Sequence, residues 1–292
     1  MKKKHLLAAL ALWMLAVALR FLIAPALERL PRDYATEIRL DTQSRFRESP
    51  DAEWETLQLT GRRVDQTLLS DPEYSIIQAD LHWTDDRGVV AYKNSGIYGV
   101  DRRTRANLPG YGNVSRTGSF MFPLHMEQKT YPYWDPSFQG ERLAAFERTD
   151  NLGGLPVYVF RFVINGLDES EGYSQLPGVP NRYKALTDAA GTIWVEPVSG
   201  KIIDYEEKGE SILAAVDTGK RVGSIYLWGA RYGEQTRTAK REEAITMRRR
   251  IHMLEIWLPL ALLAAGALWL LPVWRRSAPS ALRAAGDGGS GS

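Results

Sequence analysis

Residues 192–207 read Thr-Ile-Trp-Val-Glu-Pro-Val-Ser-Gly-Lys-Ile-Ile-Asp-Tyr-Glu-Glu, two β-branched and aromatic runs on either side of a Pro-Val-Ser-Gly turn. Successive side chains of an extended strand point to opposite faces. Ile193 and Val195 therefore share one face, and Trp194 and Glu196 share the other. The pattern predicts a β-hairpin with one face in an apolar core.

The same pattern recurs towards the N-terminus. Residues 74–83 and 89–93 flank an Asp-Asp-Arg-Gly turn that ends at Gly88, and residues 143–147 and 155–165 flank an Asn-Leu-Gly-Gly turn. Consecutive strands joined by short turns pair antiparallel, whereas a βαβ array needs a long helical crossover between strands. We therefore expect a mainly antiparallel sheet or sandwich.

Helix-forming sequence is concentrated after the strands. Residues 234–250 contain no Gly or Pro, are rich in helix formers, and lead directly into an apolar segment. One helix of about 40 residues could therefore begin outside a membrane and continue through it. A shorter helix hinged near Arg250 is the alternative, and the sequence does not separate the two.

Both ends of the chain carry apolar segments. Residues 256–274 contain no charge, and residues 6–24 are interrupted only by Arg20. A helix needs about 20 residues to cross the hydrocarbon core, so both segments are predicted to be transmembrane helices. Arg20 is close enough to the end of its segment to reach the headgroups. A cleaved signal peptide is the alternative for the first segment, but its apolar region exceeds the usual ~7–15 residues, and we expect it to be retained.

Flanking positive charges predict the orientation. Three lysines at 2–4 precede the first segment, and Arg275, Arg276 and Arg283 follow the second, so both termini are expected in the cytoplasm. Arginines at 248–250 count against this orientation because they precede the second segment.

The predicted fold class is α+β, with two transmembrane helices around a β-rich, extracytoplasmic domain. The expected parts are a cytoplasmic tail (1–5), the first transmembrane helix (6–27), the extracytoplasmic domain (28–250), the second transmembrane helix (251–274) and a cytoplasmic tail (275–292) with a flexible Gly/Ser-rich end. The chain has no cysteine, which excludes disulfides and thiolate metal sites and favours a bacterial cell membrane over a secreted eukaryotic setting.

Little in the sequence points to chemistry. Only His82 and His125 of the four histidines lie in the central domain, without further ligands at a recognisable spacing, and no nucleophile elbow or phosphate-binding loop occurs. We expect no enzyme activity, no metal and no cofactor. The 37 basic and 35 acidic residues are mixed along the chain, so nucleic acid is not an expected partner.

Aromatic residues are the most distinctive feature of the central domain. They crowd residues 120–138, and three of them alternate along 158–162. A packed core is one interpretation. An apolar cavity for an acyl chain or glycan is the other. The candidate cavity-lining residues are Phe120, Phe122, Tyr131, Trp134, Tyr158, Phe160 and Phe162.

Five segments carry a family resemblance: Tyr-Gly-Val-Asp-Arg-Arg-Thr at 98–104, Gly-Ser-Phe-Met-Phe-Pro at 118–123, Lys-Thr-Tyr-Pro-Tyr-Trp-Asp at 129–135, Gly-Leu-Pro-Val-Tyr-Val-Phe at 154–160 and Trp-Val-Glu-Pro-Val-Ser-Gly at 194–200. With the two apolar ends, their order resembles the porin PorA family of actinobacterial and related envelopes, long catalogued as a domain of unknown function. The resemblance implies an envelope protein linked to cell-wall channel activity or lipoglycan assembly, with a START-like lipid-binding fold. It implies no catalytic residues.

We expect a membrane-anchored protein that binds lipid or lipid-linked glycan in envelope biogenesis, with the bilayer and other envelope proteins as partners. A pore needs a closed β-barrel or several helices around water, and these two segments show no polar stripe beyond Arg20. The alternatives are an oligomeric, porin-like channel and a structural subunit of a larger membrane complex.

Overall fold

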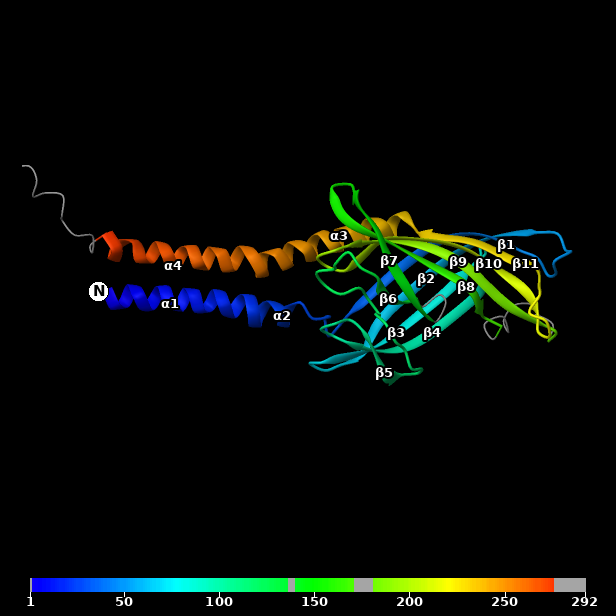
Figure 1. Cartoon of the computed structure of the whole chain (residues 1–292), viewed down its shortest axis with the longest axis horizontal. Helices are drawn as coiled ribbons and strands as arrows, with labels where there is room; N and C mark the ends of the chain where they lie inside the picture. The colour runs from blue at the N-terminus through cyan, green and yellow to red at the C-terminus, as the bar shows by residue number, and fades with distance from the viewer. Residues whose placement is uncertain (1, 136–139, 171–180, 276–292) are drawn as a thin grey trace, which may run out of the picture. The chain divides into compact units, whose positions relative to one another are not determined.

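The computed structural model describes residues 2–135, 140–170 and 181–275 (Figure 1). The chain divides into two compact units. One comprises Met1–Glu28 with Arg249–Ser292, and the other comprises Arg29–Arg248. We call them the membrane unit and the β unit. The predicted Gly/Ser-rich end, Arg276, Arg283 and Phe138 lie outside the described residues.

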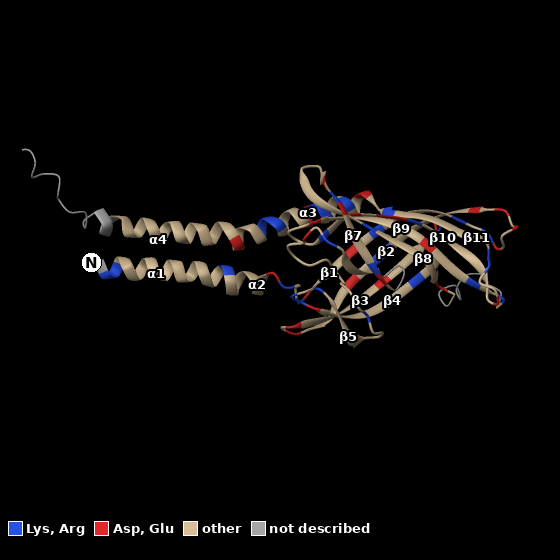
Figure 2. Ribbon diagram, in the orientation of Figure 1, with Lys and Arg blue, Asp and Glu red and all other residues tan. Residues whose placement is uncertain are grey.

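The membrane unit consists of helices from both ends of the chain. They are α1 (Lys2–Ala18), the π-helical turn η1 (Leu19–Ile23), α2 (Ala24–Leu27), the π-helical turn η3 (Met253–Trp257) and α4 (Leu258–Arg275). The helical segments Lys3–Leu27 and Glu234–Leu271 are both long and apolar enough to cross a membrane. Charged residues are sparse along α1 and α4 in Figure 2. The two predicted apolar helices are therefore present.

Small residues let the two helices of the membrane unit approach closely. Ala9 and Ala16 of α1 are buried. The Trp13 indole Nε1 donates a hydrogen bond to the Leu263 carbonyl oxygen over 3.1 Å. A Cβ added at Gly266 would lie 2.5 Å from the same Nε1, so no larger residue fits there without displacing the ring. Close approach at small residues is a common way in which helices pair in membranes.

Each helix also carries a π-helical turn two residues before a proline, Pro25 in one and Pro259 in the other. A proline has no N–H, so the helix before it loses a hydrogen bond and a wider turn accommodates the ring. Arg20 of η1 and Glu255 of η3 form an ion pair of 3.2 Å. The sequence placed Arg20 near the headgroups but did not predict its partner on the other helix.

The β unit contains an antiparallel sheet of eleven strands among the described residues. The strands are β1 (Ala35–Phe46), β2 (Glu55–Ser70), β3 (Tyr74–Thr84), β4 (Val90–Asp101), β5 (Asn107–Gly112), β6 (Tyr131–Asp135), β7 (Gly140–Leu152), β8 (Leu155–Asp168), β9 (Tyr183–Glu196), β10 (Lys201–Ala215) and β11 (Arg221–Tyr232). Their spatial order is β5-β4-β3-β2-β1-β11-β10-β9-β8-β7-β6. The predicted fold class, an antiparallel sheet between two apolar helices, is confirmed.

The three predicted hairpins are present as β3–β4, β7–β8 and β9–β10. In the last of these, Ile193 and Val195 lie in the main core, while Trp194 packs in a separate cluster on the opposite face. The alternation expected for Ile193, Trp194 and Val195 therefore holds, while a β-bulge between Ile202 and Asp204 interrupts the pattern on β10.

The sheet curls so that one face encloses the main core. Leu81 of β3 and Phe160 of β8 belong to the same buried cluster although five strands separate β3 from β8. The two edge strands are joined through Ser119, which bridges Ala106 next to β5 and Tyr133 of β6. Its N–H donates to the Pro132 carbonyl over 2.8 Å. This link covers strand edges that would otherwise be open to other chains.

Helix α3 (Glu234–His252) occupies the space left where β11 ends, between β1 and β10. On one side, the Thr236 hydroxyl accepts a hydrogen bond from the Arg39 N–H of β1 over 2.8 Å. On the other, Glu243 pairs with Lys201 of β10 over 3.2 Å. Helical residues continue without interruption from Glu234 to Arg275, through the π-helical turn η3. Of the two alternatives for this segment, a continuous helix or a shorter one hinged near Arg250, the structure has the continuous helix.

Candidate functional site

The predicted aromatic residues pack against one another. Phe122, Tyr131, Phe160 and Phe162 belong to the main core, and Phe120 belongs to a second buried cluster. Tyr158 and Trp134 are partly buried against these two clusters respectively. The rings of Phe122 and Phe160 stack with their centroids 5.4 Å apart. In this structure the side chains fill the enclosed face of the sheet, and their role as a ligand cavity stays a prediction.

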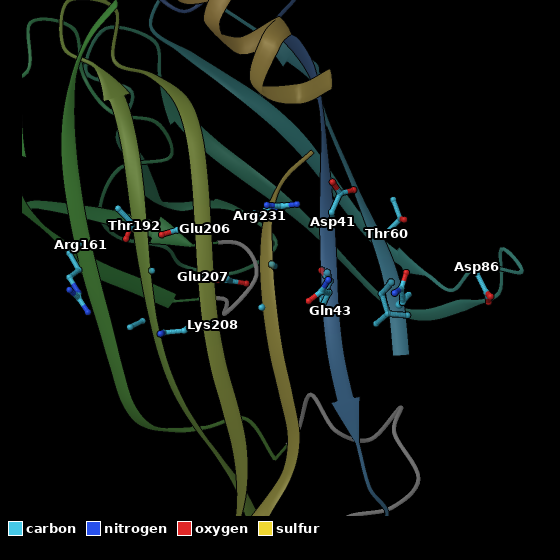
Figure 3. Close-up of a pocket in the computed structure, with 17 residues that line it drawn as sticks. Asp41, Gln43, Thr60, Asp86, Arg161, Thr192, Glu206, Glu207, Lys208 and Arg231 are labelled. Carbon is cyan, nitrogen blue, oxygen red and sulfur yellow. The ribbon is translucent and has the colours of Figure 1, made fainter. Parts of the chain in front are cut away.

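A polar hollow of about 880 Å³ lies elsewhere in the β unit (Figure 3). It is lined by β1, β2, β8, β9, β10 and β11, and Asp86 of the β3–β4 turn also contributes. None of the seven predicted aromatic residues lines it. Its volume is within the range of small-molecule sites, ~300–1,000 Å³.

Strand alternation explains why the hollow is polar. Arg161 lies between Phe160 and Phe162 on β8, so its side chain points away from the main core. Thr192 precedes the core residue Ile193 on β9 in the same way. The polar side chains of Arg161 and Thr192 are thus on the face of the sheet opposite the aromatic core, and buried residues that alternate with the exposed ones, such as Leu59 and Glu207, line the hollow too.

The strand register places one polar row across the hollow. Paired neighbours run in the order Arg161, Thr192, Glu206, Arg231, Asp41 and Thr60, one residue from each of six strands. A parallel row runs in the order Ala190, Lys208, Gly229, Gln43 and Gln58, and includes two small residues. We call the residues of these two rows the polar ladder. The small residues leave room that larger side chains would fill.

Opposite charges in the ladder are neighbours without being ion pairs. Glu206 faces Arg231, and Arg231 faces Asp41, which is the arrangement expected to favour cross-strand pairing. Within the described part of the chain, none of these three side chains has an ion-pair partner within 4.0 Å, and all three are exposed. Their charged groups thus keep their hydrogen-bonding capacity for solvent or a ligand.

Glu207, the next residue of β10, points to the other face. It is buried, and its Oε2 accepts a hydrogen bond from the Tyr205 hydroxyl over 2.6 Å. Both glutamates line the hollow, but the Glu206 side chain is exposed, whereas the Glu207 carboxylate is buried and hydrogen-bonded.

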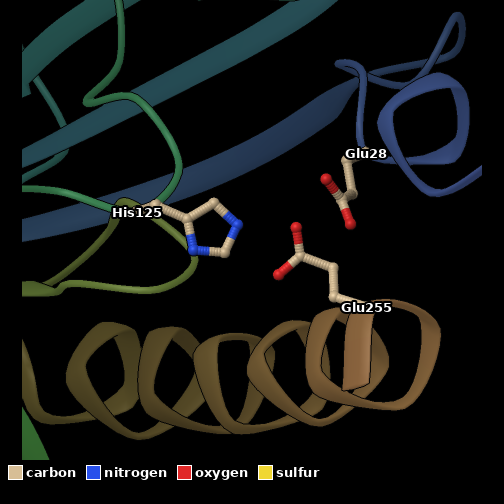
Figure 4. Close-up of side chains that lie close together, drawn as sticks. All are labelled: Glu28, His125 and Glu255. Atoms are coloured by element: carbon tan, nitrogen blue, oxygen red, sulfur yellow. The ribbon is translucent and has the colours of Figure 1, made fainter. Parts of the chain in front are cut away.

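The membrane unit holds its own pair of carboxylates. Glu28 and Glu255 point toward each other in Figure 4, with carboxylate oxygens within 4.8 Å. His125, also labelled in that figure, belongs to the β unit. The Arg20 guanidinium 3.2 Å from Glu255 supplies the positive charge that balances part of this pair.

An antiparallel β unit flanked in the sequence by two apolar, membrane-length helices is the architecture expected of a membrane-associated β-domain protein. The family comparison goes further. The porin PorA model matches residues 5–273, nearly the whole chain, and the chain belongs to this family. The family resemblance drawn from the sequence is therefore confirmed.

Two solved structures have detectable similarity. One is a protein from Bacteroides fragilis described as exported and as having a YmcC-like fold, at 9% identity and a TM-score of 0.21 over 68% of this chain and 95% of that one. The other is a LolA superfamily protein from Nitrosomonas europaea, at 12% identity and a TM-score of 0.17 over 75% and 91%. No curated protein matches the chain.

Proposed function

We propose that this chain is a membrane-anchored envelope protein whose β unit lies on the extracytoplasmic side and binds the polar part of a lipid or lipid-linked glycan in the polar hollow. The observation that carries the proposal is that Glu206, Arg231 and Asp41 are neighbours in register with alternating charge but form no ion pairs among the described residues. It binds its ligand without transforming it.

The chemistry of the ladder suits a polyhydroxylated ligand. Glu206 and Asp41 offer acceptor oxygens, and Arg231 offers a fork of donors between them. Sugar hydroxyls donate and accept, so they can satisfy both kinds of group, whereas an acyl chain can satisfy neither. The free-energy cost of removing water from these charges is compensated only if the ligand replaces the hydrogen bonds that water made to them.

Native mass spectrometry of the full chain, purified in detergent from its own membranes, tests this proposal. We expect a co-purifying adduct whose fragments contain a sugar or a polar headgroup. The R161Q/R231Q variant, which removes two donors from the ladder, should lower adduct occupancy at least fivefold. R148Q/R182Q is the matched control, because Arg148 pairs with Glu147 as Arg161 does, and neither Arg148 nor Arg182 lines the hollow.

Two results would overturn the proposal. One is an adduct whose occupancy is equal in wild type and R161Q/R231Q. The other is a wild-type chain that carries no adduct and acquires none from a total lipid extract of the same membranes. The orientation has its own test, since protease added to intact spheroplasts should cut the β unit.

A channel is the second candidate, because the family is described as a porin. Each copy would contribute the Arg20–Glu255 pair, so conduction would require several copies around one path. Planar bilayers containing the purified chain would then show conductance steps whose ion selectivity changes in R20Q/E255Q. A chain that remains silent over a range of concentrations excludes this candidate.

A further inference from the structure

The chain leaves the first apolar helix directly into a cluster of arginines. Arg29 donates from Nη1 to the Pro72 carbonyl over 2.6 Å. Arg102 donates from Nε to the Leu30 carbonyl over 2.8 Å and from Nη1 to the Asp71 carbonyl over 2.7 Å. These bonds tie the β2–β3 turn and the end of β4 to the residues that follow the helix.

The positive charge of this place is only partly compensated. Arg102 is 8% exposed. Burial lowers its pKa, as do the nearby guanidinium groups of Arg32 and Arg29, while Asp71 opposes the effect. In the described chain, the buried Nε of Arg29 has no hydrogen-bond partner, and Arg32 and Arg103 are exposed and have no ion-pair partner within 4.0 Å. We call Arg29, Arg32, Arg102 and Arg103 the arginine cluster.

An exposed apolar pair lies next to the same turn. Leu68 and Leu69, at the end of β2, are 51% and 57% exposed. They precede the segment from Asp71 to Pro72 whose carbonyls Arg29 and Arg102 bind. Basic residues next to exposed leucines are typical of surfaces that enter the boundary between headgroups and acyl chains.

Chain length places this surface at the membrane. Helix α2 ends at Leu27, and Arg29 is two residues further on, which allows at most ~7 Å. The headgroup layer on each side of the hydrocarbon core is about 5–8 Å thick. Arg29 therefore lies within the depth of the headgroups once the first helix spans the bilayer.

We propose that the arginine cluster binds the phosphate groups of anionic lipids in the leaflet on the β-unit side, while Leu68 and Leu69 enter the interfacial layer. Arginine is suited to this because its planar fork binds two phosphate oxygens at once. Arg249 and Arg250, which are exposed ahead of the second span, are placed to make the same kind of contact. It depends on the two membrane spans and not on the polar hollow.

Lipid retention by the full chain tests the headgroup contact. Protein in micelles of phosphatidylcholine with a minor fraction of phosphatidylglycerol is measured by native mass spectrometry. We compare two variants. R32Q/R103Q removes the two exposed arginines of the cluster, and R45Q/R182Q removes two exposed arginines that lie outside it, each over an aromatic ring. A surface arginine contributes about 1 kcal/mol to anionic lipid binding, so two predict a loss of up to roughly 30-fold in phosphatidylglycerol retention.

Three outcomes overturn the proposal. The first is phosphatidylglycerol retention that is unchanged in R32Q/R103Q, and the second is a loss of retention in R45Q/R182Q that equals the loss in R32Q/R103Q. The third is displacement of the bound lipid by inorganic phosphate at low millimolar concentration, which would identify a site for the free anion. Loss of retention in R161Q/R231Q alone would instead assign the bound lipid to the polar hollow, so the two proposals can fail separately.

A fluorescence measurement tests the apolar part. The chain has no cysteine, so L69C can be labelled alone with bimane in the full chain. We expect a blue-shifted emission that nitroxide lipids quench in anionic vesicles. R45C is the control. Strand β1 begins at Ala35, eight residues after the first apolar helix ends, and Arg45 lies ten residues further along the strand, a rise of about 33 Å. Equal quenching at positions 69 and 45 would refute insertion of the turn.

Discussion

Replacing Arg248 with Ala should destabilise the β unit by removing the partner of a buried carboxylate. Glu196 is 0% exposed and accepts hydrogen bonds from the Ser199 N–H over 2.7 Å and from Arg248 Nη1 over 2.6 Å. The Arg248 side chain is 28% exposed. Breaking a fully buried pair costs about 3–5 kcal/mol, and losing a charged hydrogen bond about 1.5–3 kcal/mol. Partial exposure places the expected loss near 2.5 kcal/mol.

Thermal melting of the full chain in detergent, followed by the β signal in circular dichroism, measures this loss. For a unit of this size, 1 kcal/mol corresponds to about 2–4 °C in Tm, so R248A should melt roughly 5–10 °C below wild type. R249A is the matched control because Arg249 is the exposed neighbour, and its Tm should change by less than about 2 °C.

A double-mutant cycle decides whether the pair itself is responsible. E196Q keeps an acceptor oxygen for the Ser199 N–H but removes the charge that Arg248 balances. In the E196Q background, R248A should cost at least 1 kcal/mol less than in wild type. Strict additivity of the two changes, or an R248A Tm equal to that of R249A, would refute the reasoning.

Further predictions concern the core, the α3 contact and the helix pair. F160A should lose about 3–5 kcal/mol because its ring is fully buried, whereas V163A on the same strand should lose little; the same melt compares them. Burial raises the pKa of Glu243, but the nearby Lys201 and Lys240 together lower it by more, so the pKa lies below its usual range. The ionised Glu243 carboxylate therefore stabilises the fold above its unfolded pKa of about 4.5, and this stabilisation is lost as the pH falls through its pKa in the folded protein. E243Q should therefore weaken the dependence of Tm on pH between about pH 5 and 3. G266L should reduce cross-linking between cysteines placed in the two spans, while L268A should not.

Local patterns were sufficient to predict much of the fold. The alternation at 192–207 indicated the β9–β10 hairpin and its two faces, because strand period and turn chemistry are properties of a few neighbouring residues. Uncharged length was sufficient for the apolar helices. The position of α3 between β1 and β10 was not predictable in this way, because it depends on where β11 ends relative to strands far away in the sequence.

The candidate site was harder to foresee for the same reason. The polar ladder takes one residue from each of six strands, so it exists only once their register is set. The small residues at 190–191 and 229–230 are the signal that could have pointed to it, since they interrupt two strands otherwise rich in larger side chains. The Arg20–Glu255 pair was missed because its members are 235 residues apart and only their similar depth in the two helices relates them.

Two strands that line the polar hollow, β1 and β10, also hold helix α3. Asp41 lies on β1, two residues from the Arg39 backbone that binds α3, and β1 begins eight residues after the first apolar helix ends. Glu206 lies on β10, which holds α3 through Lys201. A ligand that bridges Asp41 and Glu206 therefore links the two strands between which α3 is fixed. Because α3 continues into the second apolar helix, the strands that carry the ladder also hold the start of that helix.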